Sequence, residues 1–464
     1  MDYPCFSQQD DRLASSLKAF PSFTVKSENA EFIKCPKSFY DTLMSRISTA
    51  KKRIVFSSLY IGTGEMERNI VVSIIRALDN EPNLSVTFIL DYFRARRIDK
   101  QSSSNESSLT VLQPLLQAHG ERVSIYLFLA LRNRMLLSIA DKLPCKLGEM
   151  LGVHHVKFYC IDDSTILSGA NLSNSYFQNR LDRNLIIKDV PMFSNYIADV
   201  ADKLGNMSFR VNSVANGLEL CTTKPFTKVK LLDNSNEYQK PRWSQFNIGD
   251  CEKQGGDFMI TPLMSVPCSI DYNNGYSKLM ADFCTVFDRI WISSGYFNPT
   301  VSLQNALIQR KVIDIQVLHP SKQANGWFGA SGLFRHVPSI YNCISACAYD
   351  FCRRFFNKCS SFAFKEYQKD DWTFHCKGFW GQWNGSKQLT MIIGSSNYGY
   401  RSTLRDSELD FVISSISERG NNLLLNERNL IFDNKHVVEV FHPAKMTLIR
   451  YVQCIGLKWL KRFL

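Results

Sequence analysis

A pattern that occurs twice in the same order constrains the fold of this chain more than any other feature. His155-Val156-Lys157 precedes a turn of small residues that ends in Asn171. His375-Cys376-Lys377 precedes a second such turn, which ends in Asn397. Because motifs repeated in a matched order indicate duplication of a structural unit, the chain is predicted to contain two copies of one fold.

The duplication extends to an apolar segment upstream of each His-x-Lys motif. Residues 53–61 read Arg-Ile-Val-Phe-Ser-Ser-Leu-Tyr-Ile, and residues 289–297 read Arg-Ile-Trp-Ile-Ser-Ser-Gly-Tyr-Phe. Both segments are rich in β-branched and aromatic residues, which favour strands. Strand and helix patterns alternate in each copy, so an α/β protein with a mixed, mostly parallel sheet in each half is predicted.

The repeat divides the chain into four predicted regions. The first half is expected at residues 1–214 and the second at residues 258–440. Residues 215–257, rich in polar residues and turn formers, are interpreted as a linker. Residues 441–464 are predicted to form a C-terminal amphipathic helix, because their apolar residues recur on one side with basic residues largely opposite. Such a helix fits either an anionic membrane surface or the protein's own core.

The spacing within each motif points to phosphodiester chemistry. Residues two apart on a strand face the same side, so His155 and Lys157 are expected to project together, as are His375 and Lys377. A neutral imidazole can attack phosphorus, and its conjugate acid can protonate a leaving oxygen. Lysine and asparagine can hold the phosphoryl oxygens. Since one imidazole cannot serve opposite faces of a phosphorus, the two sets are expected to form one site without any metal.

Each histidine is expected to need a carboxylate that orients its second ring nitrogen. Asp182 and Glu408 follow the asparagines of the two turns at matched spacing. We therefore predict that Asp182 orients His155 and that Glu408 orients His375. A surface ion pair with a neighbouring arginine is the alternative for either carboxylate.

Asp162 completes a His-x-Lys-x-x-x-x-Asp run in the first copy and is a third acidic candidate for the catalytic group. The second copy has Gln382 at the matching position. We therefore expect Asp162 to stabilise a turn or to bind a lysine rather than to carry a proton.

Charge and hydropathy restrict the classes of partner. The net charge is +12 at pH 7, and the isoelectric point is about 9.0. This balance favours polyanions: nucleic acid, anionic lipid or phosphate-bearing substrates. No run of about 18 apolar residues occurs, so no transmembrane helix is expected. The N-terminal sequence, with Asp10 and Asp11, matches neither a signal peptide nor a transit peptide rich in Arg and Ser.

The chain contains 14 cysteines, none in a Cys-x-x-Cys pair. Cys160 and Cys376 lie within expected strands. Cys343, Cys347 and Cys352 lie on one expected helix, without a histidine at zinc-finger spacing. We therefore expect free, buried thiols in a reducing compartment rather than a structural zinc site.

Three segments are candidates for substrate contact. Arg94, Arg96 and Arg97 follow the end of an expected strand, a common place for ligands in α/β sheets, and either bind a phosphate or form a solvated turn. Residues 131–151 interleave basic and apolar residues directly before His155, which suits either lipid placement or a helix that covers the sheet. The aromatic residues of the loop 325–334 either line an acyl groove or pack in the core.

The motifs together resemble those of the phospholipase D superfamily, and most closely those of eukaryotic phosphatidylglycerophosphate synthases. The matching segments are residues 155–159, 167–173, 175–177, 295–298, 325–330, 375–380 and 394–402. Ser168-Gly169 replaces the usual Gly-Ser of the superfamily, and Gln382 replaces the second Asp. Both departures look typical of this branch.

The resemblance implies two phospholipase D-like α/β/α sandwich halves related by a pseudo-twofold axis. It implies that CDP-diacylglycerol and glycerol 3-phosphate give phosphatidylglycerol phosphate and CMP, on the route to cardiolipin. It also implies a mitochondrial protein, peripheral on the inner membrane. No motif requires a metal or another cofactor, and a divalent cation that assists the diphosphate is an open alternative.

Carried onto this chain, the resemblance implies a role for each motif residue. His155 is expected to form a phosphatidyl-histidine and to expel CMP. His375 is expected to protonate the departing oxygen and then to deprotonate the glycerol hydroxyl. The expected phosphoryl-binding residues are Lys157, Lys377, Asn171 and Asn397, with Ser395 among the substrate-binding residues.

Two other functions compete with this interpretation. A hydrolytic phosphodiesterase, either a phospholipase or a nuclease, would use the same residues with water as the acceptor. A nuclease should bind DNA with strong salt dependence, and nucleic acid is not the partner that we expect. A lipid-binding protein without catalysis is the second alternative, and the retention of both His-x-Lys pairs argues against it.

Overall fold

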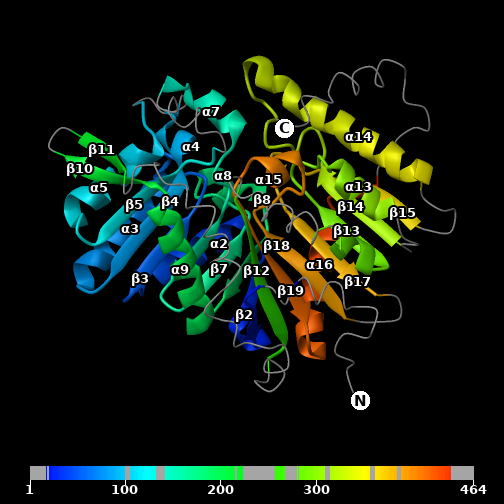
Figure 1. The fold of residues 1–464 in the computed structure, drawn as a ribbon, viewed down its shortest axis with the longest axis horizontal. Coiled ribbons are helices and arrows are strands. Elements are labelled where there is room, and N and C mark those ends of the chain that lie inside the picture. Colours follow the sequence, from blue (N-terminus) through cyan, green and yellow to red (C-terminus); the bar gives the residue numbers. More distant parts are fainter. Residues whose placement is uncertain are drawn as a thin grey trace.

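The computed structural model contains two α/β halves that lie side by side, the first coloured from blue to green and the second from green to orange (Figure 1). It describes residues 17, 20–99, 105–131, 142–214, 217–222, 256–266, 280, 282–308, 314–355, 361–383 and 388–439. Within these residues, each half is built on a nine-stranded mixed sheet. The predicted pair of α/β halves is confirmed.

The first sheet has the strand order β11-β10-β5-β4-β3-β6-β7-β9-β2. Its strands in chain order are β2 (Ala30–Ile33), β3 (Arg53–Ser57), β4 (Ser85–Asp91), β5 (Val123–Phe128), β6 (Phe158–Ile161), β7 (Ser164–Ser168), β9 (Asn184–Ile187), β10 (Phe209–Val214) and β11 (Gly217–Thr222). The central pairs β3–β4 and β4–β5 are parallel. The pairs from β3 through β6, β7 and β9 to β2 are antiparallel.

The second sheet repeats this arrangement in the order β1-β12-β19-β18-β17-β13-β14-β15-β20. Its strands are β1 (Phe23–Val25), β12 (Phe258–Ser265), β13 (Arg289–Ser293), β14 (Asp314–Pro320), β15 (Ser361–Tyr367), β17 (Gly378–Gln382), β18 (Leu389–Gly394), β19 (Glu408–Ser415) and β20 (Val437–Glu439). The parallel pairs are again central, β13–β14 and β14–β15. The strand β1, although near the N-terminus, adds to the edge of this second sheet by pairing with β12.

The expectation of mostly parallel sheets is wrong. Parallel pairing needs a long crossover, such as the one through α3 (Glu65–Asn80) between β3 and β4. The strand that directly follows the first His-x-Lys motif returns by a short turn instead. Only Asp162 and Asp163 separate β6 from β7, and a two-residue turn can join only antiparallel strands.

Helices cover the outer faces of both sheets, so that each half has its own core. In the first half these helices are α2 (Pro36–Ser48), α3 and α5 (Ser108–His119), and their buried residues join those of the strands in one cluster. Ile70, Ile74 and Leu78 of α3 recur at helical spacing and are buried, which explains why this segment packs as an amphipathic helix. In the second half, α13 (Val301–Ile308) joins the corresponding cluster.

A third core extends across both halves and fixes how they face each other. It includes residues from α9 (Pro191–Asn206) and α16 (Glu418–Phe432) together with strands of both sheets. Phe193 of α9 packs edge-on against Phe411 of β19, with 6.0 Å between the ring centroids. Because this core is continuous, the relative placement of the halves follows from apolar burial.

Further helices complete the two halves. They are α4 (Tyr92–Arg96), α7 (Cys145–Leu151), α8 (Asn174–Gln178), α14 (Val337–Phe355) and α15 (Tyr400–Leu404). Figure 1 shows α8 and α15 near the centre of the molecule, and α7 and α14 at its upper end. The helix α7 lies in the described part of the candidate region 131–151, which comprises residues 131 and 142–151.

Other sequence expectations can be compared with the described residues. Cys160 and Cys376 are free and buried as predicted. Cys347, in contrast, forms a disulfide, so the expectation of free thiols is wrong at this position. No helix among the described residues is long and apolar enough to span a bilayer. The predicted C-terminal helix at residues 441–464 lies outside the described residues.

Candidate active site

Each His-x-Lys motif is positioned by a strand contact with the opposite half. His154 forms a parallel bridge with Ser407, and the His155 N–H donates to the Ser407 carbonyl oxygen at 2.9 Å. The matching contact joins the other pair of segments. The His375 N–H donates to the Leu181 carbonyl oxygen at 2.8 Å. There β16 (Thr373–Phe374) pairs in parallel with β8 (Arg180–Leu181).

These contacts place each histidine beside the carboxylate of the other half. His155 Nδ1 lies 2.9 Å from Glu408 Oε2 and 3.1 Å from Oε1. His375 Nδ1 lies 2.6 Å from Asp182 Oδ2. The structure therefore contains two buried imidazole–carboxylate pairs, each built from both halves.

The predicted pairing of Asp182 with His155 and of Glu408 with His375 is wrong. Both residues are orienting carboxylates, but the partners are exchanged. Matched spacing within each copy identifies equivalent residues and does not reveal which histidine they meet. The exchange follows from the parallel bridges. Each carboxylate comes directly after the residue whose carbonyl oxygen accepts the hydrogen bond from the histidine's backbone N–H.

Both motif lysines are buried at the same place. Lys157 Nζ donates to the His155 carbonyl oxygen at 2.8 Å, and Lys377 Nζ donates to that of His375 at 2.9 Å. Lys377 Nζ also lies 3.7 Å from the Asp182 carboxylate. Burial lowers the pKa of each lysine, and the charge of the other lysine lowers it further at Lys157. When protonated, the two lysines make the site suited to an anion.

The two imidazoles are held in the neutral form. Burial lowers the pKa of both histidines well below the ordinary value, and the lysine of the same motif lowers it further. The charge on Asp406 opposes this shift at His155. Burial also raises the pKa of Glu408 to about 7. A neutral imidazole that donates Nδ1–H to a carboxylate leaves Nε2 unprotonated and nucleophilic.

The asparagines of the two turns have different surroundings. Asn171 Oδ1 accepts hydrogen bonds from Leu59 N at 3.3 Å and Ser58 Oγ at 3.4 Å, and its Nδ2 donates to Tyr176 Oη at 3.1 Å. Asn397 N–H donates to Ser402 Oγ at 3.0 Å. The Asn397 Oδ1 atom is buried without a hydrogen-bond partner among the described residues.

Asp162 and Ser395 have structural contacts. The Asp162 carboxylate accepts hydrogen bonds from the backbone N–H groups of Lys51, Lys52 and Arg53, which fixes the turn before β3. This is the turn-stabilising role expected for it. The buried Ser395 hydroxyl donates to Glu408 Oε2, and its predicted contact with substrate stays a prediction.

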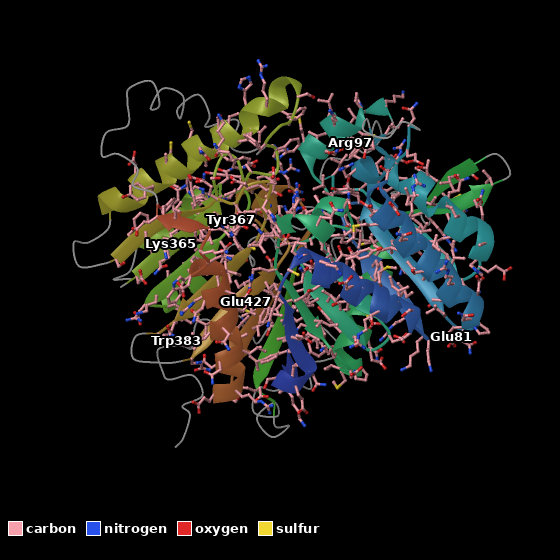
Figure 2. The ribbon with its side chains drawn as sticks, turned by 180° about the vertical axis from the view of Figure 1, so that it is seen from behind. Glu81, Arg97, Lys365, Tyr367, Trp383 and Glu427 are labelled. Atoms are coloured by element: carbon pink, nitrogen blue, oxygen red, sulfur yellow. The ribbon has the colours of Figure 1, made fainter. Side chains whose placement is uncertain are left out.

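The three candidate arginines diverge. The charge of Arg97 is balanced by Glu149, with Nη1 2.6 and 2.9 Å from the carboxylate oxygens, at the end of the molecule near α7 (Figure 2). Arg96 stacks on Tyr92, with Cζ 4.6 Å from the ring centroid. Arg94 lies over the ring of Tyr60 at 3.8 Å. Arg97 is thus a structural ion pair, and Arg94 alone stacks on a ring of the repeated segment 53–61.

Several residues near His375 were missed by the sequence reasoning. Tyr176 Oη lies 3.3 Å from His375 Nε2, and the ring of Tyr296 lies 5.7 Å from the imidazole. The guanidinium of Arg180 stacks on Tyr176 at 4.7 Å. One signal was available, because Tyr60 and Tyr296 occupy the same position in the repeated upstream strand. Arg180 has no matching basic residue in the second copy and carried no such signal.

In the described part of the chain, no three His, Cys, Asp or Glu side chains gather as they would around a metal ion.

Comparisons with known proteins agree with this geometry. Residues 43–203 match the family model described as "Cardiolipin synthase, PLD-like domain". The structure is similar to the crystal structure of phosphatidylserine synthase from Haemophilus influenzae, with a TM-score of 0.72 at 18% identity over 99% of this chain and 100% of that one. At this identity, the likeness shows the shared fold.

Sequence relatives extend the match to most of the chain. A Dictyostelium discoideum protein named "Probable CDP-diacylglycerol--glycerol-3-phosphate 3-phosphatidyltransferase" is 30% identical over 461 residues, covering 92% of this chain and 77% of the relative. A Gallus gallus protein with the same enzyme name, designated mitochondrial, is 30% identical over 437 residues, covering 85% of this chain and 76% of the relative. This chain therefore belongs to the CDP-diacylglycerol–glycerol-3-phosphate 3-phosphatidyltransferase family of the phospholipase D superfamily.

Proposed function

We propose that this protein transfers the phosphatidyl group of CDP-diacylglycerol to glycerol 3-phosphate, which gives phosphatidylglycerol phosphate and CMP. The observation that carries the proposal is the pair of buried imidazole–carboxylate contacts, each formed across the boundary between the halves. Two buried lysines beside them provide positive charge for a phosphodiester. Membership of the family supplies the substrate class.

In the proposed first step, Nε2 of neutral His155 attacks the phosphatidyl phosphorus. A P–N bond forms, and the P–O bond to CMP breaks. Glu408 accepts the Nδ1–H hydrogen bond and stabilises the positive charge that develops on the imidazole. His375 gives its proton to the departing CMP oxygen, and the negative charge of the bound diphosphate raises the pKa of His375 toward the protonated form.

In the second step, His375 accepts a proton from the primary hydroxyl of glycerol 3-phosphate. That oxygen attacks the phosphorus from the side that CMP has left, and the P–N bond to His155 breaks. Asp182 holds Nδ1 of His375 through this transfer. Lys157 and Lys377 stabilise the equatorial oxygens in both steps. The assignment of His155 as nucleophile follows the family resemblance.

We further propose that lipid reaches the site across a surface formed by α7 and the loop 325–334, here named the α7–Trp327 surface. It carries exposed apolar side chains: Leu147 (53% exposed), Met150 (39%), Trp327 (37%) and Phe328 (55%). Solvent-exposed apolar clusters of this kind mark interaction sites. Both segments belong to the candidate regions identified from the sequence.

Two contacts support a shared position for these segments beside the site. Lys146 Nζ of α7 lies 5.2 Å from the ring centroid of Phe334, so the two segments meet across the halves. The backbone at Gly326 lies against Tyr296, which contacts His375. Basic and apolar side chains together favour an anionic bilayer. We propose a peripheral location on the mitochondrial inner membrane, in keeping with the mitochondrial designation of the Gallus gallus relative.

The deciding experiment uses purified protein, vesicles that contain CDP-diacylglycerol, and labelled glycerol 3-phosphate. The expected result is a labelled lipid formed in the same amount as CMP. Release of CMP without a labelled lipid would support the hydrolase alternative and overturn the transferase proposal.

The covalent step has its own test. His375→Ala should slow the second step, so that radiolabelled phosphatidyl groups remain attached to His155 and can be located by peptide mapping. A label on His375 in a His155→Ala variant, together with no label on His155 in the His375→Ala variant, would reverse the two roles.

A further inference from the structure

Because the two halves repeat one strand order, residues at matched positions can be paired. One such pair, close to the orienting carboxylates, differs in charge. Arg180 stands two residues before Asp182, whereas Asp406 stands two residues before Glu408. A hydrolase that cleaves one diester has no need of this difference. A transferase with two unlike substrates does.

In the second half, the acidic residue at this position is neutralised within the protein. Arg401 Nη2 lies 2.9 Å from Asp406 Oδ1, and Arg401 Nε lies 3.0 Å from Oδ2. The same carboxylate accepts a hydrogen bond from Val153 N at 3.1 Å. This pair is a bidentate ion pair that ties α15 to the segment before His155.

In the first half, Arg180 has no such counter-ion. Its Nε donates to Thr373 Oγ1 at 2.9 Å, and its guanidinium stacks on the ring of Tyr176 at 4.7 Å. No carboxylate lies within ion-pair distance of it in the part of the chain that the structure describes. The side chain is partly buried, so the cation has reduced hydration. Its charge acts on the Asp182 carboxylate, but that carboxylate is already bonded to His375 and lies 3.7 Å from Lys377 Nζ.

The guanidinium lies close to the reacting groups. Tyr176, on which it stacks, places its hydroxyl 3.3 Å from His375 Nε2. The loop 325–334 approaches from the other side, because a Cβ at Gly326 would lie 3.4 Å from Arg180 Nη2 and 2.5 Å from Tyr296 Oη. Glycine at this position keeps space beside the guanidinium.

We propose that Arg180 binds the phosphate monoester of the acceptor, glycerol 3-phosphate, and thereby selects it over glycerol and water. This proposal rests on the transferase function proposed above. A planar guanidinium binds phosphate oxygens in pairs, and its attachment to Thr373 and Tyr176 fixes its orientation. The phosphate so held places the acceptor on the side of His375, the residue that takes the hydroxyl proton.

The experiment measures steady-state transfer by the full chain with both substrates varied. Arg180→Gln should raise the KM for glycerol 3-phosphate by about 10- to 100-fold, with a smaller change for CDP-diacylglycerol, since a hydrogen-bonded charge is lost. The KM of Arg180→Lys for glycerol 3-phosphate should lie between those of the unaltered protein and Arg180→Gln, because lysine keeps the charge and loses the paired donors. Arg419→Gln removes an exposed arginine on α16 and serves as the control.

A second measurement is independent of the fraction of folded protein. The ratio of transfer to glycerol 3-phosphate over transfer to glycerol is taken within each variant, and it should fall by about 10- to 100-fold in Arg180→Gln. An unchanged ratio, or a KM increase confined to CDP-diacylglycerol, would overturn the acceptor assignment. Absence of labelled lipid with the unaltered protein would instead contradict the proposed function itself.

Discussion

Glu408 reaches His155 from the other half of the molecule and, in the proposed mechanism, leaves Nε2 of the ring to attack phosphorus. The Ser395 hydroxyl donates to Oε2 of the same carboxylate, the oxygen that lies 2.9 Å from His155 Nδ1. Replacement by Gln keeps the size of the side chain and removes the charge that stabilises the imidazolium. We expect Glu408→Gln to lower kcat by about 10²- to 10⁴-fold with little change in the KM for either substrate.

Asp182→Asn provides the matched comparison at the other histidine. It should also lower kcat, but with accumulation of the phosphatidyl adduct, because the step that depends on His375 is slowed. Equal adduct levels in the two variants, measured by acid quench and mass spectrometry, would contradict the assigned order of the steps.

The carboxyl group of Glu408 is expected to make activity depend on pH. Burial raises the pKa of Glu408 to about 7, from an ordinary value of about 4.3. Since the ionised form is the one that supports His155, activity should be present above pH 7 and should be lost as the pH falls through about 7. A pH–rate profile of kcat/KM for CDP-diacylglycerol measures this inflection. If the Glu408→Gln variant keeps this inflection, the inflection belongs to another group.

For individual residues, the sequence predicts which residue types form the site better than it predicts which of them contact each other. The motif histidines and lysines, together with Asp182 and Glu408, gather as expected because local spacing and repetition reveal them. The exchange of carboxylates and the role of Arg180 depend on contacts between segments of opposite halves. No periodicity within one copy carries that information.

Among the elements, β9 and α16 are tied together by a buried ion pair between the halves. Arg183, just before β9, donates to both carboxylate oxygens of Glu427 on α16, with Nε 2.5 Å from Oε1. Figure 2 labels Glu427. It also donates to the carbonyl oxygen of Lys377 at 2.8 Å. The indole of Trp380 binds the same carboxylate at 3.0 Å.

Removal of the arginine leaves this carboxylate buried with one donor. Arg183→Met should lower the free energy of unfolding by about 3–5 kcal/mol, as measured by urea denaturation. Arg183→Met combined with Glu427→Gln should recover part of the loss, because Gln carries no charge and still accepts from Trp380. A double variant as unstable as the single one would show that the cost arises from packing and not from the unpaired charge.

The α7–Trp327 surface predicts a difference between membrane-bound and dispersed substrate. Trp327→Ala with Phe328→Ala should reduce flotation with anionic vesicles about 10-fold or more, because two exposed aromatic rings no longer enter the interface. Activity on substrate dispersed in detergent should be retained. Leu430→Ala, which removes a similarly exposed side chain on α16, is the control. Equal losses in both assays would indicate damage to the site instead.

Element types were predicted more reliably than their directions. The repeated segments 53–61 and 289–297 contain β3 and β13, because their residue types favour strands in any context. The antiparallel return of β6 and β7 follows from the turn at Asp162 and Asp163. The parallel assignment came from the alternation of strand and helix, which describes only the central part of each sheet.

For the whole molecule, duplication was readable from the order of motifs, and the strand orders of the two sheets repeat it. The continuous core between the halves could not be predicted from the sequence, because α9 and α16 taken alone have the pattern of ordinary amphipathic helices. Their buried faces meet the opposite half as well as their own. Sequence pattern identifies an apolar face and leaves its partner undetermined.

The net charge of +12 predicts that the proposed membrane binding depends on salt. Affinity for vesicles with anionic lipid should fall as ionic strength rises, since screening shortens the reach of surface charge to about 10 Å at 0.1 M. Sedimentation over a salt series measures this, with zwitterionic vesicles as the reference. Equal binding to both vesicle types at low salt would contradict an electrostatic contribution.

The exchange of carboxylates also limits how such an enzyme can be recombined. A chimera that takes its first half from one relative and its second from another would unite Asp182 of one parent with His375 of the other, and Glu408 with His155 in the reverse sense. Both imidazole–carboxylate pairs would then combine residues of two parents. Compatibility at the junction, rather than the quality of either parent half, would therefore decide whether the recombinant turns over.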